Sequence, residues 1–155
     1  MKILVVSDNH FDQSGLKKAL NRYQDCDLYI HCGDSNMSPE ELKPFAAVKG
    51  NNDFDKGLPK YRVIDTPKHS FYVTHGHYEY CDYDEMGLKA RMTGCDTVLY
   101  GHTHIFDDTE VNGIRFINPG SISYNRDGTN PCFALIYIND ATGDMYVERI
   151  DVKNI

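Results

Sequence analysis

Short apolar runs and one helical pattern alternate along the first fifty residues. Residues 2–7 form an apolar, β-branched run in which only the first and last side chains are polar, as is typical of a central strand covered on both faces. Residues 13–23 place apolar side chains at helical spacing. Two further runs, 28–32 and 45–49, predict two more strands.

A second helix is predicted to begin at Ser38, between the strands at 28–32 and 45–49. Ser38 is a favourable N-cap, Pro39 suits the first turn, and acidic residues follow near the N-terminus. The resulting order of strand, helix, strand, helix and strand predicts right-handed parallel crossovers.

The second half predicts a second sheet built from shorter elements. Residues 109–117 turn through the hairpin dipeptide Asn112-Gly113, and Gly94 is expected to end a helix. That helix covers 84–93, and strands are expected at 61–65, 70–74, 96–100, 133–138 and 145–150. Short strands joined by turns favour a mostly antiparallel sheet. Two packed sheets with helices outside would bury the core of one domain, residues 1–155.

Composition agrees with a globular chain, at 41% hydrophobic and 25% charged residues. The apolar run near the N-terminus is too short for a signal peptide and far too short to cross a bilayer. We therefore expect a cytoplasmic protein with no membrane partner. Five cysteines without a Cys-x-x-Cys pair predict reduced thiols, not disulfides or a thiolate zinc site.

The formal net charge of −7 argues against a nucleic-acid partner, because no basic stripe is present. An anionic substrate would have to be attracted locally, and bound metal could provide that attraction. The oligomeric state stays open, a homo-oligomer included.

Polar, metal-binding side chains follow five of the predicted strands. In parallel sheets ligands bind beyond the carboxyl ends of the strands, so these groups should meet at one edge. They are Asp8, His10, Asp34, Asn51, His75, His102 and His104. Carboxylate, imidazole and amide together suit Mn²⁺, Fe, Ni²⁺ or Zn²⁺ better than Ca²⁺ or Mg²⁺. Each residue alone could be a turn, cap or strand-end residue, but the recurrence at five strand ends favours a metal site.

The pair His102 and His104 needs a bend in the backbone. In an extended strand these two rings would point to opposite faces. Gly101 interrupts the apolar run before them, and a strand-to-loop bend would turn both rings toward one cleft.

The order of five motifs resembles the calcineurin-like metallophosphoesterases, and the size and spacing are most similar to their small bacterial and archaeal phosphodiesterase branch. The motifs are Asp8-Asn9-His10, Gly33-Asp34, Gly50-Asn51-Asn52-Asp53, His75-Gly76-His77 and Gly101-His102-Thr103-His104. The resemblance implies an α/β fold, a four-layer α/β/β/α sandwich with two mixed β-sheets flanked by helices.

The resemblance also implies a centre of two divalent metal ions, Mn²⁺ first and Ni²⁺, Zn²⁺ or Fe as alternatives. Asp34 would bridge the two ions. One ion would be held by Asp8, His10 and His104, and the other by Asn51, His75 and His102. A hydroxide bridging the metals would attack the phosphorus of a small phosphodiester.

The sequence departs from the family pattern at Asn52, where many relatives have a histidine. An amide cannot donate a proton near pH 7. We therefore expect either substrates with good leaving groups, or proton donation to the leaving group by water or His77. For His77 itself, contact with the substrate and support of its loop are equally favoured roles. Asp53 is expected to orient a metal-binding histidine. Phe11, where relatives often have glycine, is expected to narrow the entrance, and His31 is interpreted as structural or exposed.

Three functions remain in competition. The first is a metal-dependent phosphodiesterase, and the second is a phosphomonoesterase or nucleotide phosphatase with the same metal core. The third is a non-catalytic scaffold that resembles the retromer subunit of this superfamily, which keeps the fold and has lost catalytic ligands. The complete ligand set counts against the scaffold, and the lack of a basic groove counts against a nuclease.

Overall fold

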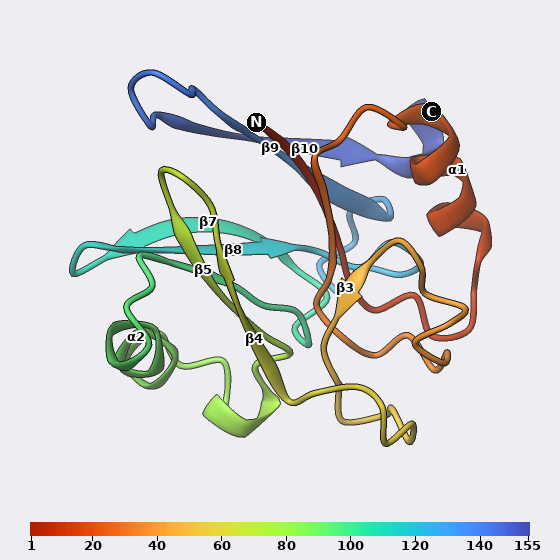
Figure 1. Ribbon diagram of the computed structural model, residues 1–155. Coiled ribbons are helices and arrows are strands. Elements are labelled where there is room, and N and C mark those ends of the chain that lie inside the picture. The colour runs from red at the N-terminus through yellow and green to blue at the C-terminus, as the bar shows by residue number, and fades with distance from the viewer.

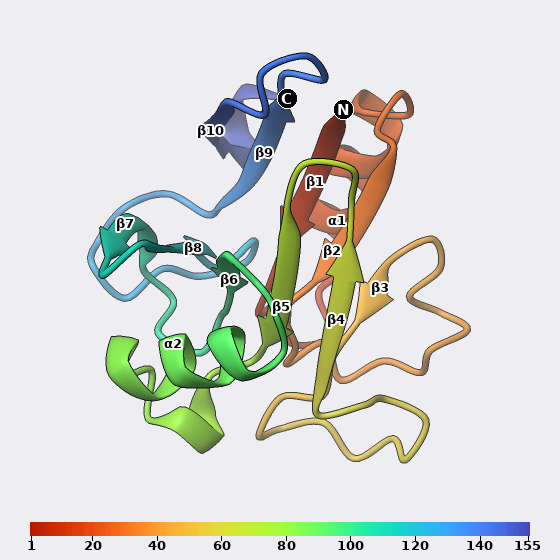
Figure 2. The same cartoon turned by 60° about the vertical axis from the view of Figure 1, so that its left-hand side comes forward.

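Two five-stranded sheets pack face to face, and one helix covers the outer face of each (Figures 1 and 2). The computed structural model describes all residues, 1–155. The strand orders are β10-β9-β1-β2-β3 and β4-β5-β6-β8-β7. The four layers are therefore α/β/β/α with two mixed sheets, which confirms the predicted fold class. No helix is both long enough and apolar enough to span a membrane.

The first sheet carries the strands predicted for the N-terminal half. Its strands are β1 (Lys2–Val6), β2 (Leu28–His31), β3 (Ala46–Ala47), β9 (Cys132–Ile138) and β10 (Met145–Asp151). β1, β2 and β3 run parallel, as predicted, whereas β9 is antiparallel to both β1 and β10. The C-terminal hairpin thus joins the first sheet and not the second, because β9 is almost entirely apolar and buried and so occupies a central position beside β1.

The second sheet is mixed, so the expectation of a mostly antiparallel sheet was wrong. Its strands are β4 (Tyr61–Asp65), β5 (Ser70–Thr74), β6 (Thr97–Leu99), β7 (Phe106–Val111) and β8 (Ile114–Pro119). The central pairs β5–β6 and β6–β8 are parallel, and only the outer pairs are antiparallel. The helix between β5 and β6 provides the long crossover that a parallel pair requires. The Asn112-Gly113 turn joins β7 to β8 as predicted, with positive φ at both residues.

Two helices form where the sequence predicted them, at 13–23 and 84–93. They are α1 (Ser14–Arg22) and α2 (Tyr83–Met92), and single turns of 3₁₀ helix, η1 (His77–Glu79) and η2 (Val152–Asn154), occur near the site and at the C-terminus. Asp82 caps α2 by accepting a hydrogen bond from the Asp84 N–H, and Gly94 follows the helix with φ of +74°.

The second helix predicted from Ser38 does not form. Ser38 and Glu41 exchange side-chain to backbone hydrogen bonds like a capping box, at 3.3 and 2.8 Å, but the chain then continues in turns. Pro44 has no N–H for a helical hydrogen bond and disfavours the helical conformation of Lys43. Too few residues therefore remain between Ser38 and Pro44 for a stable helix.

The core lies in three layers separated by the sheets. Alternate residues of β1 point to opposite faces: Ile3 and Val5 pack between the two sheets, and Leu4 and Val6 pack under α1. A third cluster fills the space under α2. Both faces of β1 are buried, as its continuous apolar run predicted.

Candidate metal centre

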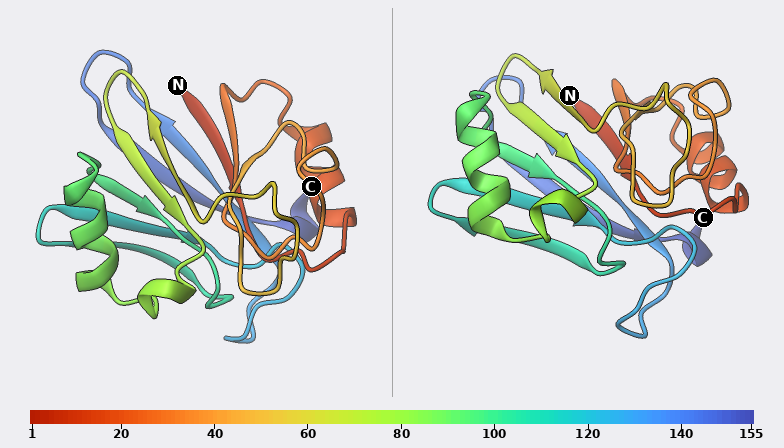
Figure 3. Two further views of the ribbon diagram at one scale, coloured as in Figure 1. Left: turned by 60° about the horizontal axis from the view of Figure 1, so that its bottom comes forward. Right: turned by 90° about the horizontal axis from the view of Figure 1, so that it is seen from below.

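The loops that follow the parallel strands of both sheets gather at one end of the molecule, which the right-hand view of Figure 3 shows from below. All seven predicted ligands lie in these loops. Asp8 and His10 follow β1, Asp34 follows β2 and Asn51 follows β3; His75 follows β5, and His102 and His104 follow β6. Because the parallel strands of both sheets have their carboxyl ends at the same edge, residues about a hundred positions apart become neighbours.

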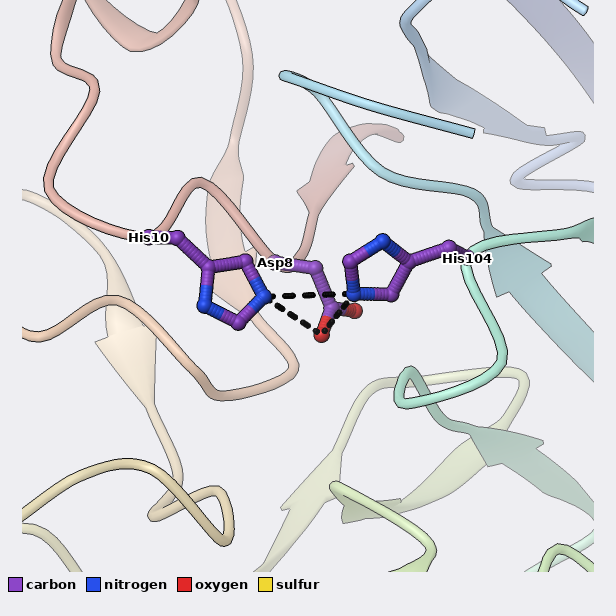
Figure 4. Close-up of side chains that lie close together, drawn as sticks. All are labelled: Asp8, His10 and His104. Carbon is purple, nitrogen blue, oxygen red and sulfur yellow. Dashed lines mark hydrogen bonds and ion pairs between the residues drawn. The ribbon is translucent and has the colours of Figure 1, made fainter. Parts of the chain in front are cut away.

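Asp8, His10 and His104 form a first group of converging ligand atoms (Figure 4). Asp8 Oδ1 lies 3.2 Å from His104 Nε2 and 3.7 Å from His10 Nε2, and the two Nε2 atoms are 3.2 Å apart. Ligands about 2 Å from a tetrahedral metal are themselves about 3.3 Å apart, so these separations suit one cation between them.

A second group contains Asp8, Asp34 and His75. His75 Nε2 lies 3.3 Å from Asp34 Oδ2 and 3.8 Å from Asp8 Oδ1. The Asn51 side-chain oxygen lies 3.1 Å from both His75 Nε2 and His102 Nδ1. Asp34 Oδ2 is also 3.9 Å from His10 Nε2, which puts this carboxylate between the two groups.

The carboxylate of Asp8 gives the test of whether a cation fits. Its Oδ2 accepts hydrogen bonds from Ser7 Oγ at 2.6 Å and from the His102 N–H at 3.1 Å. Its Oδ1 is buried and has no hydrogen-bond partner. A buried, unpaired carboxylate oxygen is costly, and a cation among the surrounding imidazoles would remove that cost. The residues present therefore fit a metal centre.

Two imidazoles are oriented by backbone carbonyls. His75 Nδ1 donates to the carbonyl of Cys32 at 2.7 Å, and His104 Nδ1 donates to the carbonyl of Tyr124 at 2.8 Å. Each bond places the hydrogen on Nδ1 and leaves the Nε2 lone pair facing the carboxylates. This is the arrangement that fixes metal-binding histidines in proteins.

The backbone of the site lies largely in the left-handed region. Five of the seven candidate ligands have positive φ: Asp8, His10, Asp34, His102 and His104. This conformation costs a residue other than glycine about 1 kcal/mol or more, and such strain concentrates at functional sites. It turns both histidines of the His-x-His pair toward other candidate ligands, His102 toward Asn51 and His104 toward Asp8.

The charges of the site shift the pKa values of its members in opposite directions. Burial alone would lower the pKa of His75, but its hydrogen bond to Asp34 and the charges of Asp8 and Asp34 hold that pKa above the usual value. Burial would raise the pKa of Asp8 and Asp34, yet the neighbouring histidines keep both below the usual value. A cation bound here would compete with a proton for the Nε2 atom of His75.

Asn52 contacts the centre, whereas Asp53 acts differently from the expectation. The Asn52 backbone N–H and side-chain amide donate to the two oxygens of Asp34 at 2.8 and 2.9 Å. Asp53 accepts hydrogen bonds from the N–H groups of Asp34, Gly50 and Asn36 at 2.7–2.8 Å. These partners are all backbone N–H groups and none is a histidine. Asp53 therefore holds two of the site's loops together and does not, as expected, orient a histidine ring.

His77 lies behind the histidines of the second group. Its ring centroid is 5.4 Å from that of His75 and 6.2 Å from that of His102, and its Nδ1 has no partner. Burial and the charges of His75 and His102 lower the pKa of His77, which weakens it as a proton donor near neutral pH. Substrate contact and loop support both stay open for this residue.

His31 is a structural histidine. It is fully buried, its Nε2–H donates to Asn9 Oδ1 at 2.8 Å, and its Nδ1 accepts from the Gly33 N–H at 3.0 Å. Burial lowers the pKa of His31 to about 4. Nδ1 contacts the loop that carries Asp34, and Nε2 contacts the loop that carries Asp8 and His10, so this ring supports the site without entering it.

We expect His31 to make the metal-free protein acid-sensitive. The unfolded chain takes up a proton on His31 near pH 6.5, whereas the folded chain resists it until about pH 4. The free energy of unfolding should therefore fall as pH drops through this window, by about 1.4 kcal/mol per pH unit from this group. His31→Gln should flatten that slope in urea unfolding series with EDTA. An unchanged slope, with His69→Gln as the matched control, would contradict the assignment.

Ser121 and Asn118 shape the site through hydrogen bonds to its loops and were not predicted as site residues. Ser121 Oγ donates to the Asp8 carbonyl at 2.8 Å. The Asn118 amide donates to the Gly101 carbonyl at 2.9 Å and to Thr103 Oγ1 at 3.0 Å. The available signal was the polar stretch 118–121 at the end of an apolar strand, the same signal that marked the ligands.

Comparison with known proteins identifies the family. Residues 1–141 match the model of the calcineurin-like phosphoesterase superfamily domain. The chain belongs to this superfamily. A probable metallophosphoesterase from Bacillus subtilis is 33% identical, over 91% of this chain and 87% of its own length. A phosphodiesterase from Methanocaldococcus jannaschii is 32% identical, over 77% of this chain and 83% of its own.

Solved structures support the same placement. A protein from Streptococcus pneumoniae, described as a predicted phosphoesterase, superposes with a TM-score of 0.89 at 29% identity, covering 98% of this chain and 90% of its own. Vps29 from Entamoeba histolytica complexed with Zn²⁺ superposes with a TM-score of 0.71 at 26% identity, covering 98% and 99%. This member of the calcineurin-like phosphoesterases is thus a metallophosphoesterase by family, and its Asp and His clusters are candidate metal ligands.

Proposed function

We propose that this protein is a metal-dependent phosphodiesterase whose centre holds two divalent cations. The observation that carries the proposal is the buried, unpaired Asp8 Oδ1, which lies within 4 Å of Nε2 atoms from three histidines. The relative named as a phosphodiesterase supports the diester over the monoester. A phosphomonoesterase with the same centre is the alternative that substrate comparison must test.

In this proposal each metal has three ligands of its own and shares Asp34. Asp8, His10 and His104 hold one ion, Asn51, His75 and His102 hold the other, and the position of Asp34 between the groups suits a bridge. The donor set of imidazole, carboxylate and amide oxygen suits Mn²⁺, with Ni²⁺, Zn²⁺ or Fe as alternatives. Bound ions would supply an acidified water near neutral pH and charge stabilisation for the phosphoryl oxygens.

The protein's own residues set the local charge. Asp8 and Asp34 contribute −2 against the +4 of two divalent ions, so the loaded centre is positive although the chain carries −7. The serine, backbone and amide hydrogen bonds to both carboxylates hold them in place for this role. A phosphodiester anion is therefore attracted by the centre and not by surface lysines or arginines.

Asn52 makes the rate depend strongly on the leaving group. Its amide cannot protonate an alkoxide, and the lowered pKa of His77 weakens the other nearby candidate. Asn52→His should therefore reduce the slope of log kcat against leaving-group pKa, raising the rate on poor leaving groups about tenfold while changing p-nitrophenyl esters little. A series of aryl phosphodiesters measures this, with Asn52→Gln as the control. Equal slopes in all three proteins would contradict the role.

A metal-loading experiment tests the proposal as a whole. The purified protein is expected to contain close to two divalent ions per chain by elemental analysis. EDTA should abolish hydrolysis of bis(p-nitrophenyl) phosphate and lower Tm, and added Mn²⁺ should restore both. Faster turnover of p-nitrophenyl phosphate than of the diester would favour the monoesterase. No hydrolysis with Mn²⁺, Ni²⁺ or Zn²⁺ would favour the non-catalytic scaffold, an alternative suggested by the structural similarity to Vps29.

A further inference from the structure

A pocket of about 420 Å³, a size that accommodates a small molecule, lies among the loops that follow β1, β2 and β3. Three ligand loops contribute to its lining. The lining residues are Phe11, Asn36, Met37, Ser38, Asp53, Phe54 and Asp55. Phe11 directly follows the candidate ligand His10, and Phe54 directly follows the candidate positioning residue Asp53.

The pocket is joined rigidly to the centre by hydrogen bonds. The N–H groups of His10 and Phe11 donate to the carbonyls of Asp34 and Ser35 at 3.1 and 3.0 Å, which ties the loop after β1 to the loop after β2. The Asn36 N–H donates to Asp53 at 2.7 Å, and the Asn36 amide donates to the Asn52 carbonyl at 2.6 Å. The same Asn52 contacts Asp34, so the pocket and the centre share one framework.

Two phenylalanine rings at this pocket are left in solvent. Phe11 is 71% exposed and Phe54 is 86% exposed, and neither packs on another aromatic ring. Phenylalanine usually contributes its large apolar area to a core, so two exposed rings at one pocket indicate a surface that awaits an apolar partner. Phe11, which was expected to narrow the entrance of the site, lines this pocket.

The charges around the pocket restrict what can occupy it. No lysine or arginine lines it, whereas Asp53 and Asp55 do. A second phosphate or another anionic group would be repelled there. A neutral planar ring can stack on a phenylalanine face, and its polar edge can meet the amide and hydroxyl groups of Asn36 and Ser38.

We propose that Phe11 and Phe54 form a binding subsite for the nucleoside part of a phosphoester that carries a single phosphate. The inference rests on the proposed function for the position of the phosphate, which the metal centre binds while the base stacks in the pocket. Nucleoside esters with one phosphate are then preferred over alkyl esters of equal reactivity, and nucleoside polyphosphates are disfavoured.

The first experiment measures binding without hydrolysis. Adenosine is titrated into zinc-loaded protein and followed by saturation-transfer NMR, with ribose as the comparison ligand. We expect transfer to the base protons of adenosine and none to free ribose. The double variant Phe11→Ala/Phe54→Ala should weaken adenosine binding about tenfold, the loss typical of a removed stacking ring. Both rings are exposed, so these changes leave the core intact.

Tyr146→Ala is the matched control, because Tyr146 is a 64% exposed aromatic residue on β10, outside this pocket. It should bind adenosine like the unmodified protein. Equal adenosine binding by the double variant, or no binding by the unmodified protein, would overturn the subsite. If the phosphodiesterase proposal fails and the subsite proposal holds, the protein will bind adenosine but will not hydrolyse phosphodiesters.

The second experiment compares two diesters that release the same p-nitrophenolate. The thymidine 5′ ester of p-nitrophenyl phosphate should be turned over with at least tenfold higher kcat/KM than the methyl ester. The preference should reside in KM and should disappear in the Phe11→Ala/Phe54→Ala protein. No preference in the unmodified protein, or a preference that survives the double substitution, would count against the inference.

Discussion

Asp34→Asn is expected to abolish phosphoester turnover, a loss of at least about a thousandfold, while leaving the fold largely intact. The Asp34 carboxylate lies 3.3 Å from His75 Nε2 and 3.9 Å from His10 Nε2, so it is near a histidine of each ligand group. The amide has nearly the same shape but lacks the charge that would hold two cations. His75→Ala should have an equally large effect, since it removes a candidate ligand that lies within 4 Å of both aspartates.

Activity, metal content and far-UV circular dichroism together test this prediction. Asp34→Asn should bind fewer than two metal ions and retain the spectrum of the unmodified protein. Asp144→Asn removes the same charge from an exposed residue in the β9–β10 turn and should change neither property. Retained turnover in Asp34→Asn would exclude Asp34 as a bridging ligand.

Gly50→Ala is expected to damage both stability and the metal centre. A Cβ at position 50 would lie 2.1 Å from Asp34 Oδ1 and 2.4 Å from the Asp34 backbone nitrogen. A side chain could rotate away, but the backbone nitrogen is held by Asp53 at 2.8 Å. The loop must therefore shift, with an expected cost of about 3 kcal/mol in unfolding free energy and loss of turnover.

Gly94→Ala separates this packing effect from the general cost of replacing a glycine. Position 94 has φ of +74° but open space around it, so only the backbone penalty of about 1 kcal/mol should appear. Urea unfolding in EDTA measures both variants without a contribution from metal. A Gly50→Ala protein as stable and as active as Gly94→Ala would show that the two loops are not as closely packed as described.

The periodic patterns of the chain were reliable where one local signal dominated. The continuous apolar run of β1, the helical spacing of α1 and the Asn112-Gly113 turn all formed as predicted. The helix predicted from Ser38 failed because a proline six residues later outweighed a good N-cap. The C-terminal hairpin joined the other sheet because strand pairing depends on long-range burial, which local alternation does not encode.

The candidate site shows the same division between local and tertiary information. Residue type and position after a strand singled out the seven candidate ligands, because parallel strands bring their carboxyl ends to a common edge. Neighbouring residues could not reveal the left-handed backbone of five candidate ligands, the carbonyls that orient His75 and His104, or the partners of Asp53.

The sequence by itself determined the α/β class, the family and the identity of the candidate ligands. Hydrophobic periodicity and the order of motifs can be read along the chain without knowing how it folds. Only the tertiary structure decided the sheet order, the unpaired oxygen of Asp8 and the pocket between Phe11 and Phe54. These features depend on contacts between segments far apart in the chain, and such contacts exist only once both sheets have packed together.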